Sequence, residues 1–249
     1  MIRLILIIIF LILFFTVGQL SLLIGFLLSI FDKELEYKFY KRIINIVFDV
    51  ILFISGVSVE VIGKENIETY LNNGVSKLLI SNHRSFFDII AGYGIYKDKV
   101  CYMSKDELKK FFLLKIWMDK INCIFIDRKN IKDAMKSIIV AIKNIQNGIS
   151  VWIFSEGTRN KNENQLDLLE FKEGSFSIAK KTGCEIVPIA FLNTDDVFEK
   201  HFPIIKKSKI KIIIGKSFFV KDLDSEYSDR VSVYAMNEIK KLMKLGIDK

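Results

Sequence analysis

The sequence predicts an α/β domain with a largely parallel, mixed sheet flanked by helices on both faces, preceded by N-terminal membrane-embedded helices. Two features of the 249 residues support this fold class. The N-terminal part is strongly apolar, and from about residue 57 short runs rich in isoleucine and valine alternate with segments of helical periodicity. We therefore expect membrane-associated helices over residues 1–56 and one α/β domain over residues 57–249.

The segment Leu4–Phe31 contains no charged residue and few polar ones. As a helix it would be about 40 Å long, which exceeds the hydrocarbon core of a bilayer at roughly 30 Å. It could span the membrane with tilt, or bend at Gly18 or Gly25 and lie partly in one leaflet. A signal peptide is the competing interpretation, but the run is longer than a typical apolar region of that kind and no small-residue cleavage site follows.

A second apolar stretch, Ile43–Ile54, follows the charged segment "FDKELEYKFYKR" and is interrupted by Asn45 and Asp49. It suits a helix at the membrane interface or packed against the first segment, and equally an amphipathic core helix. Basic residues are more frequent after the long apolar segment than before it, where Arg3 stands. By the positive-inside rule this places the main domain on the cytoplasmic side of the membrane.

Within the second part, five short apolar runs end at polar residues or glycine and are predicted to be strands. They cover residues 77–81, 123–127, 149–154, 185–191 and 209–215. Residues 130–148 form a predicted helix that stops at Gly148, with an apolar face made by Ile131, Ala134, Met135, Ile138, Ile142 and Ile145. Residues 228–246 form a closing helix with Ser228 as its N-cap. Alternating strands and helices favour a mostly parallel sheet.

The composition narrows the classes of partner and cofactor. The net charge is +8, but Lys and Arg are spread along the chain, so an anionic lipid surface or substrate is a simpler partner than nucleic acid. Cys101, Cys123 and Cys184 have no metal-like spacing and indicate reduced thiols. With only two histidines a zinc site would lack ligands. We expect no metal and no cofactor.

Three predicted strands lead directly into polar segments, at His83 to Asp88, Asp127 to Arg128 and Glu156 to Arg159. In a parallel sheet, residues at the carboxyl ends of the strands meet at one edge, where ligands usually bind. The polar stretch "RNKNENQLDLLEF" that follows is interpreted as a mobile loop over this edge.

The segment "NHRSFFD" has two interpretations. Ser85 followed by Asp88 and an apolar run is typical of a helix start, which would make His83 an incidental loop residue. Alternatively, Asp88 orients His83 as a general base. Five positions apart in one helix, two side chains diverge by about 140°, so the pair can meet only if His83 precedes the helix. The Ser85 cap provides that arrangement, leaving one ring nitrogen free to accept a proton.

The segment "FSEGTRN" is a candidate phosphate site. Arg159 offers a planar fork, Gly157 permits close approach of the backbone, and Glu156 could hold the arginine or bind a substrate hydroxyl. A solvated turn with a surface ion pair is the alternative.

Other polar residues are weaker candidates. Arg128 could be a second anion contact, Lys172 precedes a predicted helix, and Lys105 is weaker still. No nucleophile elbow surrounds Ser85, which we interpret as a cap. His201 is expected at the surface.

These motifs are more specific together than apart. In the order "NHRSFFD", "CIFIDR", "FSEGTR" and "IVPIA", behind an apolar N-terminus, they resemble the glycerolipid acyltransferases, specifically the 1-acyl-sn-glycerol-3-phosphate acyltransferases, over about residues 75–195. The first family motif, Asn-His-x-x-x-x-Asp, is matched by Asn82, His83 and Asp88. The third, usually Phe-Pro-Glu-Gly-Thr-Arg, is matched by residues 154–159, with Ser155 in place of the proline.

The other two motifs fit less completely. The second usually has glycine where Asn122 stands, whereas Ile126 and Arg128 fit. The fourth is represented by Val187, Pro188 and Ile189. The departures at Ser155 and Asn122 leave the reactive and charged side chains of the motifs intact. They therefore bear on substrate preference more than on activity.

The resemblance implies a membrane-bound enzyme that transfers an acyl group from acyl-CoA or acyl-carrier protein to lysophosphatidic acid, giving phosphatidic acid in phospholipid biosynthesis. It implies His83 as base and Asp88 as its orienting acid. The phosphate would be bound by Glu156, Gly157, Thr158 and Arg159, with Arg128 as a second contact. Two alternatives stay open: an acyltransferase for another acceptor (glycerol 3-phosphate, another lysophospholipid or a lipid A precursor), and a non-catalytic lipid-binding membrane protein.

Overall fold

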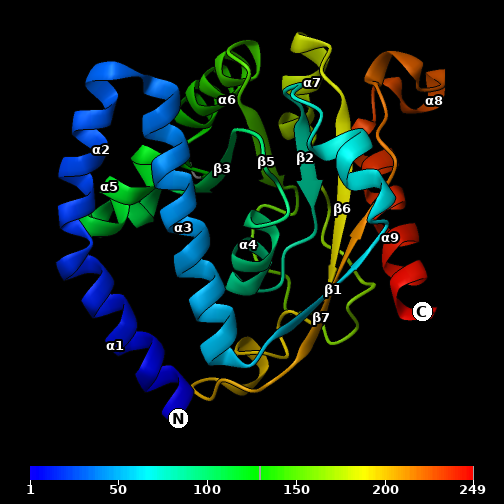
Figure 1. Ribbon diagram of the computed structural model, residues 1–249. Coiled ribbons are helices and arrows are strands. Elements are labelled where there is room, and N and C mark those ends of the chain that lie inside the picture. The colour runs from blue at the N-terminus through cyan, green and yellow to red at the C-terminus, as the bar shows by residue number, and fades with distance from the viewer. Residues whose placement is uncertain (129, 249) are drawn as a thin grey trace.

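The computed structural model describes residues 1–128 and 130–248, and within them a seven-stranded sheet has the order β1-β7-β6-β2-β5-β3-β4 (Figure 1). The strands are β1 (Ser58–Ile62), β2 (Leu78–Ser81), β3 (Val100–Lys105), β4 (Ile124–Ile126), β5 (Ser150–Phe154), β6 (Ile186–Leu192) and β7 (Lys209–Ile214). Neighbouring strands are parallel except β6 and β7, which are antiparallel. The predicted largely parallel, mixed sheet is confirmed.

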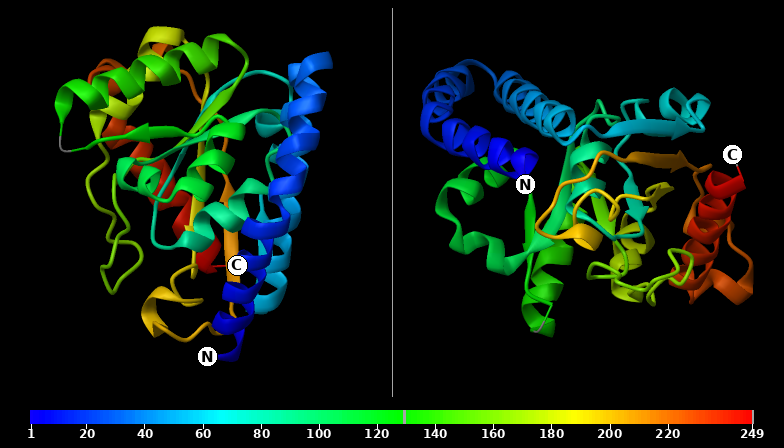
Figure 2. Two further views of the ribbon diagram at one scale, coloured as in Figure 1. Left: turned by 90° about the vertical axis from the view of Figure 1, so that its left-hand side faces the viewer. Right: turned by 90° about the horizontal axis from the view of Figure 1, so that it is seen from below.

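Helices cover both faces of this sheet. Strand residues alternate between the faces, so that Leu79 packs on one side with α3 (Lys33–Ser55), α4 (Phe86–Tyr93) and α5 (Phe112–Lys120). Leu78 and Ile80 pack on the other side with α6 (Ile131–Gln146), α7 (Ser177–Thr182) and α9 (Val231–Asp248). The helices α1, α2 and α3 stand together at one side of the domain, and α9 lies at the opposite side (Figure 2).

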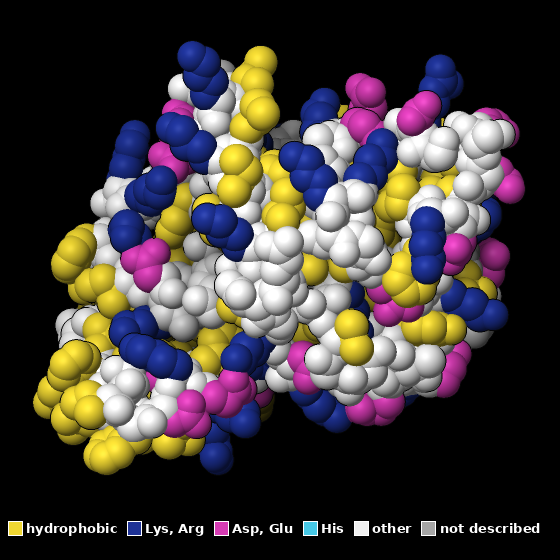
Figure 3. Space-filling model, turned by 90° about the horizontal axis from the view of Figure 1, so that it is seen from above, with side chains coloured by type: hydrophobic (Ala, Val, Ile, Leu, Met, Phe, Trp, Pro, Cys, Tyr) yellow, Lys and Arg dark blue, Asp and Glu magenta, His cyan; other side chains and the backbone are white. Residues whose placement is uncertain are grey.

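The two N-terminal helices, α1 (Ile2–Val17) and α2 (Gln19–Phe31), meet at Gly18 with a bend of 45°. Among the described residues no single helix is long and apolar enough to cross a bilayer, but this bent pair together meets the requirement by length and composition. The bend falls at one of the two predicted glycines. Apolar side chains gather along the edge where these helices lie (Figure 3).

The helix α3 differs from the prediction, because it is continuous through the charged segment instead of beginning near Ile43. The Asp32 side chain caps its first turn by accepting the N–H of Glu34 at 2.7 Å, and Gly56 ends it with φ of 68°. The helix packs closely against α2, since a Cβ on Gly25 would lie 2.2 Å from the hydroxyl oxygen of Tyr40.

Two helices on the other face also differ in detail. Ile131 and Met135, expected on the apolar face of α6, are 79% and 61% exposed. The rest of the predicted face is partly confirmed: Ile145 is buried together with Ser137 and Ala141, and Ile138 and Ile142 pack partly buried against the same cluster. The predicted cap Ser228 is wrong, because it ends the short helix α8 (Ser225–Ser228), and α9 begins only at Val231. There the carboxylate of Glu173 accepts the N–H of Ser232 at 2.9 Å.

Candidate active site

The candidate site begins where β2 ends. The side chain of Asn82 pairs with the backbone of Phe191 in β6, donating to its carbonyl oxygen at 2.9 Å and accepting its N–H at 2.8 Å. An asparagine amide has the same donor and acceptor arrangement as a peptide group, so it continues the strand pairing by one step. This contact fixes the backbone immediately before His83.

His83 and Asp88 lie together, with 2.8 Å between Nδ1 of the ring and Oδ2 of the carboxylate. Asp88 is fully buried, and the same oxygen accepts the N–H groups of Arg84 at 2.7 Å and Ser85 at 2.9 Å. Because this oxygen acts as an acceptor, Nδ1 of His83 must be the donor, and Nε2 of the neutral ring carries the lone pair. The geometry fits a general base with an orienting carboxylate.

The helix-cap interpretation of this segment holds as well. The hydroxyl of Ser85 accepts the N–H of Phe87 at 3.0 Å, and Asp88 accepts the N–H of Ser85, which completes a capping box. His83 therefore precedes α4, and Asp88 lies in its first turn. One carboxylate both starts the helix and orients the imidazole.

The His83 ring is held from the neighbouring strand too. It stacks on Phe154 at the end of β5, with the ring centres 4.2 Å apart and the planes at 23°. The carboxylate of Glu156 accepts the backbone N–H of His83 at 2.8 Å. The side chain of His83 is 15% exposed, so solvent and substrate reach only one part of the ring.

The hydrogen-bond partners of Glu156 differ from the expected ones. Its other carboxylate oxygen accepts the side chain of Asn160 at 2.9 Å and the N–H of Leu169 at 2.8 Å. Burial raises the pKa of this carboxyl, and the hydrogen bonds from His83, Leu169 and Asn160 partly oppose the rise. Glu156 does not hold Arg159, but ties the His83 backbone to the loop of residues 159–171.

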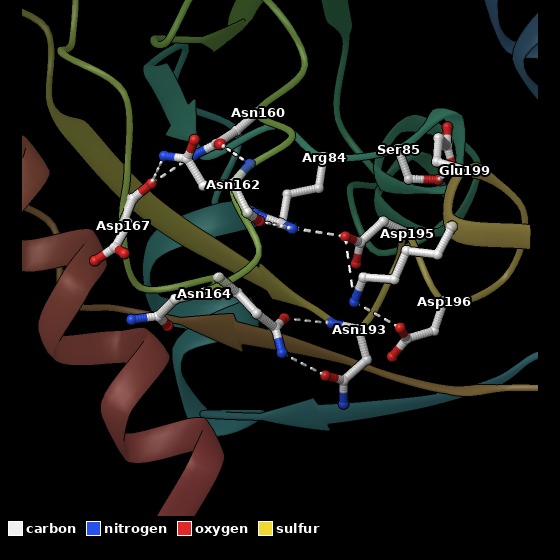
Figure 4. A network of polar contacts seen from close by, with 12 residues as sticks. Arg84, Ser85, Asn160, Asn162, Asn164, Asp167, Asn193, Asp195, Asp196 and Glu199 are labelled. Atoms are coloured by element: carbon white, nitrogen blue, oxygen red, sulfur yellow. Dashed lines mark hydrogen bonds and ion pairs between the residues drawn. The ribbon is translucent and has the colours of Figure 1, made fainter.

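That loop has no helix or strand, yet it is bonded to the site. Asn160 donates its N–H to the carbonyl of His83 at 2.7 Å and its side-chain amide to the carbonyl of Asp167 at 2.8 Å. Gln165 and Asn193 pair through both side-chain and backbone groups, at 2.8 and 2.9 Å. These bonds fix the loop over the carboxyl end of the sheet (Figure 4).

The backbone explains why glycine, asparagine and serine stand at three positions of the second and third motifs. Gly157 has φ of 75° and Asn122 has φ of 57°, both in the left-handed region that favours glycine. Asn122 stands where the family usually has glycine, and asparagine is one of the residues that best tolerates this region. Ser155 donates its N–H to the carbonyl of Ser81 at 3.1 Å, a bond that proline at this position could not form.

Arg159 lines the larger of two cavities at this edge, with a volume of about 750 Å³. Its guanidinium lies 4.1 Å from the ring centre of Phe86 and donates to Glu199 at 3.2 Å. Arg84 lines the same cavity but is buried, and it bonds the carboxylate of Asp195 at 2.9 Å and the carbonyl of Asn162 at 2.6 Å (Figure 4).

The smaller cavity has a volume of about 380 Å³ and lies beside Phe154. Its polar lining residues are Arg128, Glu156, Gly157, Thr158, Lys172, Gly174 and Ser175. Its apolar lining residues are Met103, Ile126, Ala134, Ile138, Ile153 and Phe154. The structure thus divides the predicted phosphate-binding residues between two cavities, with Arg159 in the larger and the others in the smaller.

Lys105 lies outside both cavities; its ammonium pairs with Glu107 at 3.0 Å. His201 is half-buried in a short turn (Glu199–His201) after β6. Among the described residues, no group of three or more His, Cys, Asp or Glu side chains could hold a metal ion. The three cysteines are free thiols.

Sequence reasoning missed three charged residues of the site. Arg84 lies inside the first motif, but nothing in the sequence pairs it with Asp195, 111 positions later. Glu199 accepts the N–H of Phe86 at 2.9 Å, although the two residues are 113 positions apart in the sequence. Both carboxylates belong to the connection after β6, which enters the site because β6 lies next to β2 in the sheet.

Comparison with known proteins finds related sequences. The acyltransferase family model matches residues 58–192, which include β1 to β6 and the residues from Asn82 to Arg159. A 1-acyl-sn-glycerol-3-phosphate acyltransferase from Borreliella burgdorferi is 31% identical over 66% of this chain and 62% of its own length. One from Saccharomyces cerevisiae is 26% identical over 75% of this chain and 61% of its own. The chain therefore spans about three fifths of these relatives.

The fold has a solved counterpart. The crystal structure of the 1-acyl-sn-glycerophosphate (LPA) acyltransferase PlsC from Thermotoga maritima superposes with a TM-score of 0.81 at 23% identity. The match covers 98% of this chain and 95% of the other. With a family model that matches more than half of its residues, and with the motifs at one edge of the sheet, the chain belongs to the acyltransferase family.

Proposed function

We propose that this protein is a 1-acyl-sn-glycerol-3-phosphate acyltransferase, which moves a fatty acyl group from a thioester to the sn-2 hydroxyl of lysophosphatidic acid. The observation that carries the proposal is the His83–Asp88 pair, with 2.8 Å between Nδ1 and Oδ2 and a ring that is partly open to solvent. Such a pair suits proton transfer from a hydroxyl to a histidine. The names of the relatives from Borreliella burgdorferi and Saccharomyces cerevisiae support this choice of acceptor.

In the proposed reaction, Nε2 of His83 takes the proton of the acceptor hydroxyl while its oxygen attacks the thioester carbonyl carbon. The tetrahedral intermediate then collapses, the carbon–sulfur bond breaks, and the imidazolium returns the proton to the leaving thiolate. Asp88 stabilises the imidazolium through Nδ1. General-base help of this kind contributes about 10² to 10⁴ in rate, and positioning of the two substrates supplies much of the remainder.

The two cavities suit the two substrates. The larger is lined by four cations, three carboxylates and three phenylalanines, and the partly exposed Arg159 among them suits a phosphate headgroup with an apolar neighbour. The smaller has mostly apolar walls with Arg128, Lys172 and Glu156, which suits an acyl chain and the phosphate-bearing carrier of acyl-CoA or acyl-carrier protein. His83 adjoins both cavities, since its chain neighbour Arg84 lines the first and its stacking partner Phe154 lines the second.

The membrane part of the proposal rests on α1 and α2. Their exposed leucine, isoleucine and phenylalanine side chains would enter one leaflet on the cytoplasmic side, where the acceptor lipid and the donor thioesters meet. The reaction needs no cofactor, because the proton moves through His83 and the thioester is already activated.

An acceptor screen tests the proposal. The purified protein in mixed micelles would receive labelled acyl-CoA, or acyl-carrier protein, with lysophosphatidic acid, glycerol 3-phosphate or lysophosphatidylcholine. We expect phosphatidic acid as the main product. A clear preference for another acceptor would assign the protein to a different acyltransferase class, and no transfer to any acceptor would favour the non-catalytic lipid-binding alternative.

A further inference from the structure

The carboxylate of Glu199 is bound by three donors at the entrance of α4. One oxygen accepts the hydroxyl of Ser85 at 2.6 Å, and the other accepts the N–H of Phe86 at 2.9 Å and the guanidinium of Arg159 at 3.2 Å. Glu199 reaches them from the short turn after β6, and its side chain lies beside Ser85 (Figure 4).

These donors are of the kind that bind phosphate. An arginine fork, a hydroxyl and a backbone N–H at the start of a helix commonly bind phosphate oxygens. Here they bind a carboxylate of the chain itself. The side chains of Arg159 and Glu199 are 37% and 20% exposed, so a ligand in the larger cavity can reach the pair.

We propose that Glu199 occupies the anion site as an internal competitor, which the phosphate of the acceptor must displace. This inference rests on the proposed function. A phosphate monoester carries up to two charges and three acceptor oxygens, whereas Glu199 offers one charge and two oxygens. A phosphate can therefore replace Glu199 at these donors, while an acceptor with an uncharged headgroup cannot.

Displacement lowers the apparent affinity of the site for the phosphate, whereas an uncharged headgroup does not compete for these donors. A ligand that binds only when Glu199 has left has its apparent affinity reduced by the fraction of molecules in which the site is open. If Glu199 instead positioned Arg159 for the phosphate, its removal would weaken binding of the acceptor. The two roles predict opposite changes in KM.

The test is Glu199→Gln, measured with lysophosphatidic acid and with 1-acylglycerol, which has no phosphate. Glutamine can still accept from Ser85 and Phe86 through its amide oxygen, so the start of α4 is kept. We expect KM for lysophosphatidic acid to fall roughly fivefold, the factor that corresponds to about 1 kcal/mol for a partly exposed ion pair. The inhibition constant of inorganic phosphate should fall by a similar factor.

Selectivity is the second readout. The ratio of kcat/KM for lysophosphatidic acid to that for 1-acylglycerol should increase in Glu199→Gln, because only the phosphate competes with the carboxylate for these donors. Glu226→Gln is the matched control, since Glu226 is exposed on α8 and lines neither cavity. Its constants should stay within about twofold of wild type, the usual size of effect for an exposed substitution.

A rise in KM, or no change beyond that of the control, would overturn the displacement role. Glu199→Ala is measured beside Glu199→Gln, and a fall in KM is expected of whichever variant folds, as judged by its thermal transition. Failure of wild type to acylate lysophosphatidic acid would count against the proposed function instead, so the two failures can be told apart.

Discussion

At the scale of single residues, the site depends on one oxygen atom of Asp88. This oxygen accepts the ring N–H of His83 and the backbone N–H groups of Arg84 and Ser85. The carboxylate that caps the helix is therefore also the proposed orienting group of the catalytic histidine. The contacts from Phe154 and Glu156 then fix the position of His83 from the neighbouring strand.

We predict that Asp88→Asn lowers kcat by about a hundredfold or more, because an amide cannot stabilise the imidazolium that forms during proton transfer. Asparagine can still accept the N–H groups of Arg84 and Ser85, so the cap should persist. Steady-state kinetics with lysophosphatidic acid check this, with Asp229→Asn at an exposed position as control. A kcat equal to that of wild type in Asp88→Asn would contradict the role given to the carboxylate.

Local motifs predicted the partners within one segment and missed those between segments. The contact of His83 with Asp88 followed from a spacing of five and a helix start. The sequence did not predict that Arg159 pairs with Glu199 rather than with Glu156. This contact depends on where the connection after β6 returns to the sheet. Sequence spacing carries no information on such a contact, which is set by strand order.

At the scale of elements, α3 carries a buried lysine whose charge is costly. Lys41 is 7% exposed, donates to the carbonyl of Asp98 and lies 5.4 and 5.5 Å from the ring centres of Tyr93 and Tyr96. Burial lowers its pKa from 10.5 to about 8, with a partial opposing effect of Asp98. Between about pH 8 and pH 10.5 the unfolded chain therefore binds more protons than the folded one, so the free energy of unfolding rises with pH.

We predict that this rise is absent in Lys41→Met. From pH 8 to pH 10.5 the free energy of unfolding of wild type, relative to the variant, should increase by up to about 3 kcal/mol. Denaturant unfolding in detergent at both pH values measures it, and Lys38→Met, at a largely exposed side chain, should show no such difference. A constant gap between wild type and Lys41→Met would show that the lysine keeps an ordinary pKa.

The contact of α2 with α3 gives another prediction at this scale. Gly25→Ala would bring a methyl group into the Tyr40 ring, and overpacking of this kind costs about 1 to 3 kcal/mol. Gly94→Ala is the control, because nothing lies within 4 Å of the added atom there. Thermal unfolding compares the two variants, and equal stability would mean that the two helices are not tightly packed.

Element prediction succeeded where the apolar pattern was continuous. The five predicted strands are present as β2, β4, β5, β6 and β7. The strand β3, "VCYMSK", was missed because cysteine, tyrosine and methionine interrupt the isoleucine and valine pattern, although Val100–Met103 are buried. The edge strand β1, "SVEVI", is short and half-exposed, which leaves little pattern to detect.

At the scale of the whole molecule, the catalytic domain and the apolar helices suit an enzyme that takes its acceptor from a leaflet. We predict that replacing Ile5, Ile9, Leu23 and Leu27 by glutamine reduces binding to lipid vesicles by at least about a hundredfold. All four are about half-exposed or more, and burying each in lipid stabilises binding by roughly 1.5 to 3 kcal/mol. Flotation with vesicles containing anionic lipid measures this.

In the matched control, glutamine replaces Val233 and Leu245, which are exposed on α9 at the opposite side of the domain (Figure 1). This variant should bind vesicles as wild type does. If both variants lose binding equally, or neither does, α1 and α2 are not the membrane contact.

His83 is the proposed base in acyl transfer to lysophosphatidic acid. Its most direct test compares wild type, His83→Ala and His201→Ala at equal amounts, with lysophosphatidic acid and labelled acyl-CoA in mixed micelles. We predict phosphatidic acid from wild type and from His201→Ala at similar rates, and a rate lower by about a hundredfold or more for His83→Ala. Product from His83→Ala at the wild-type rate would contradict the claim.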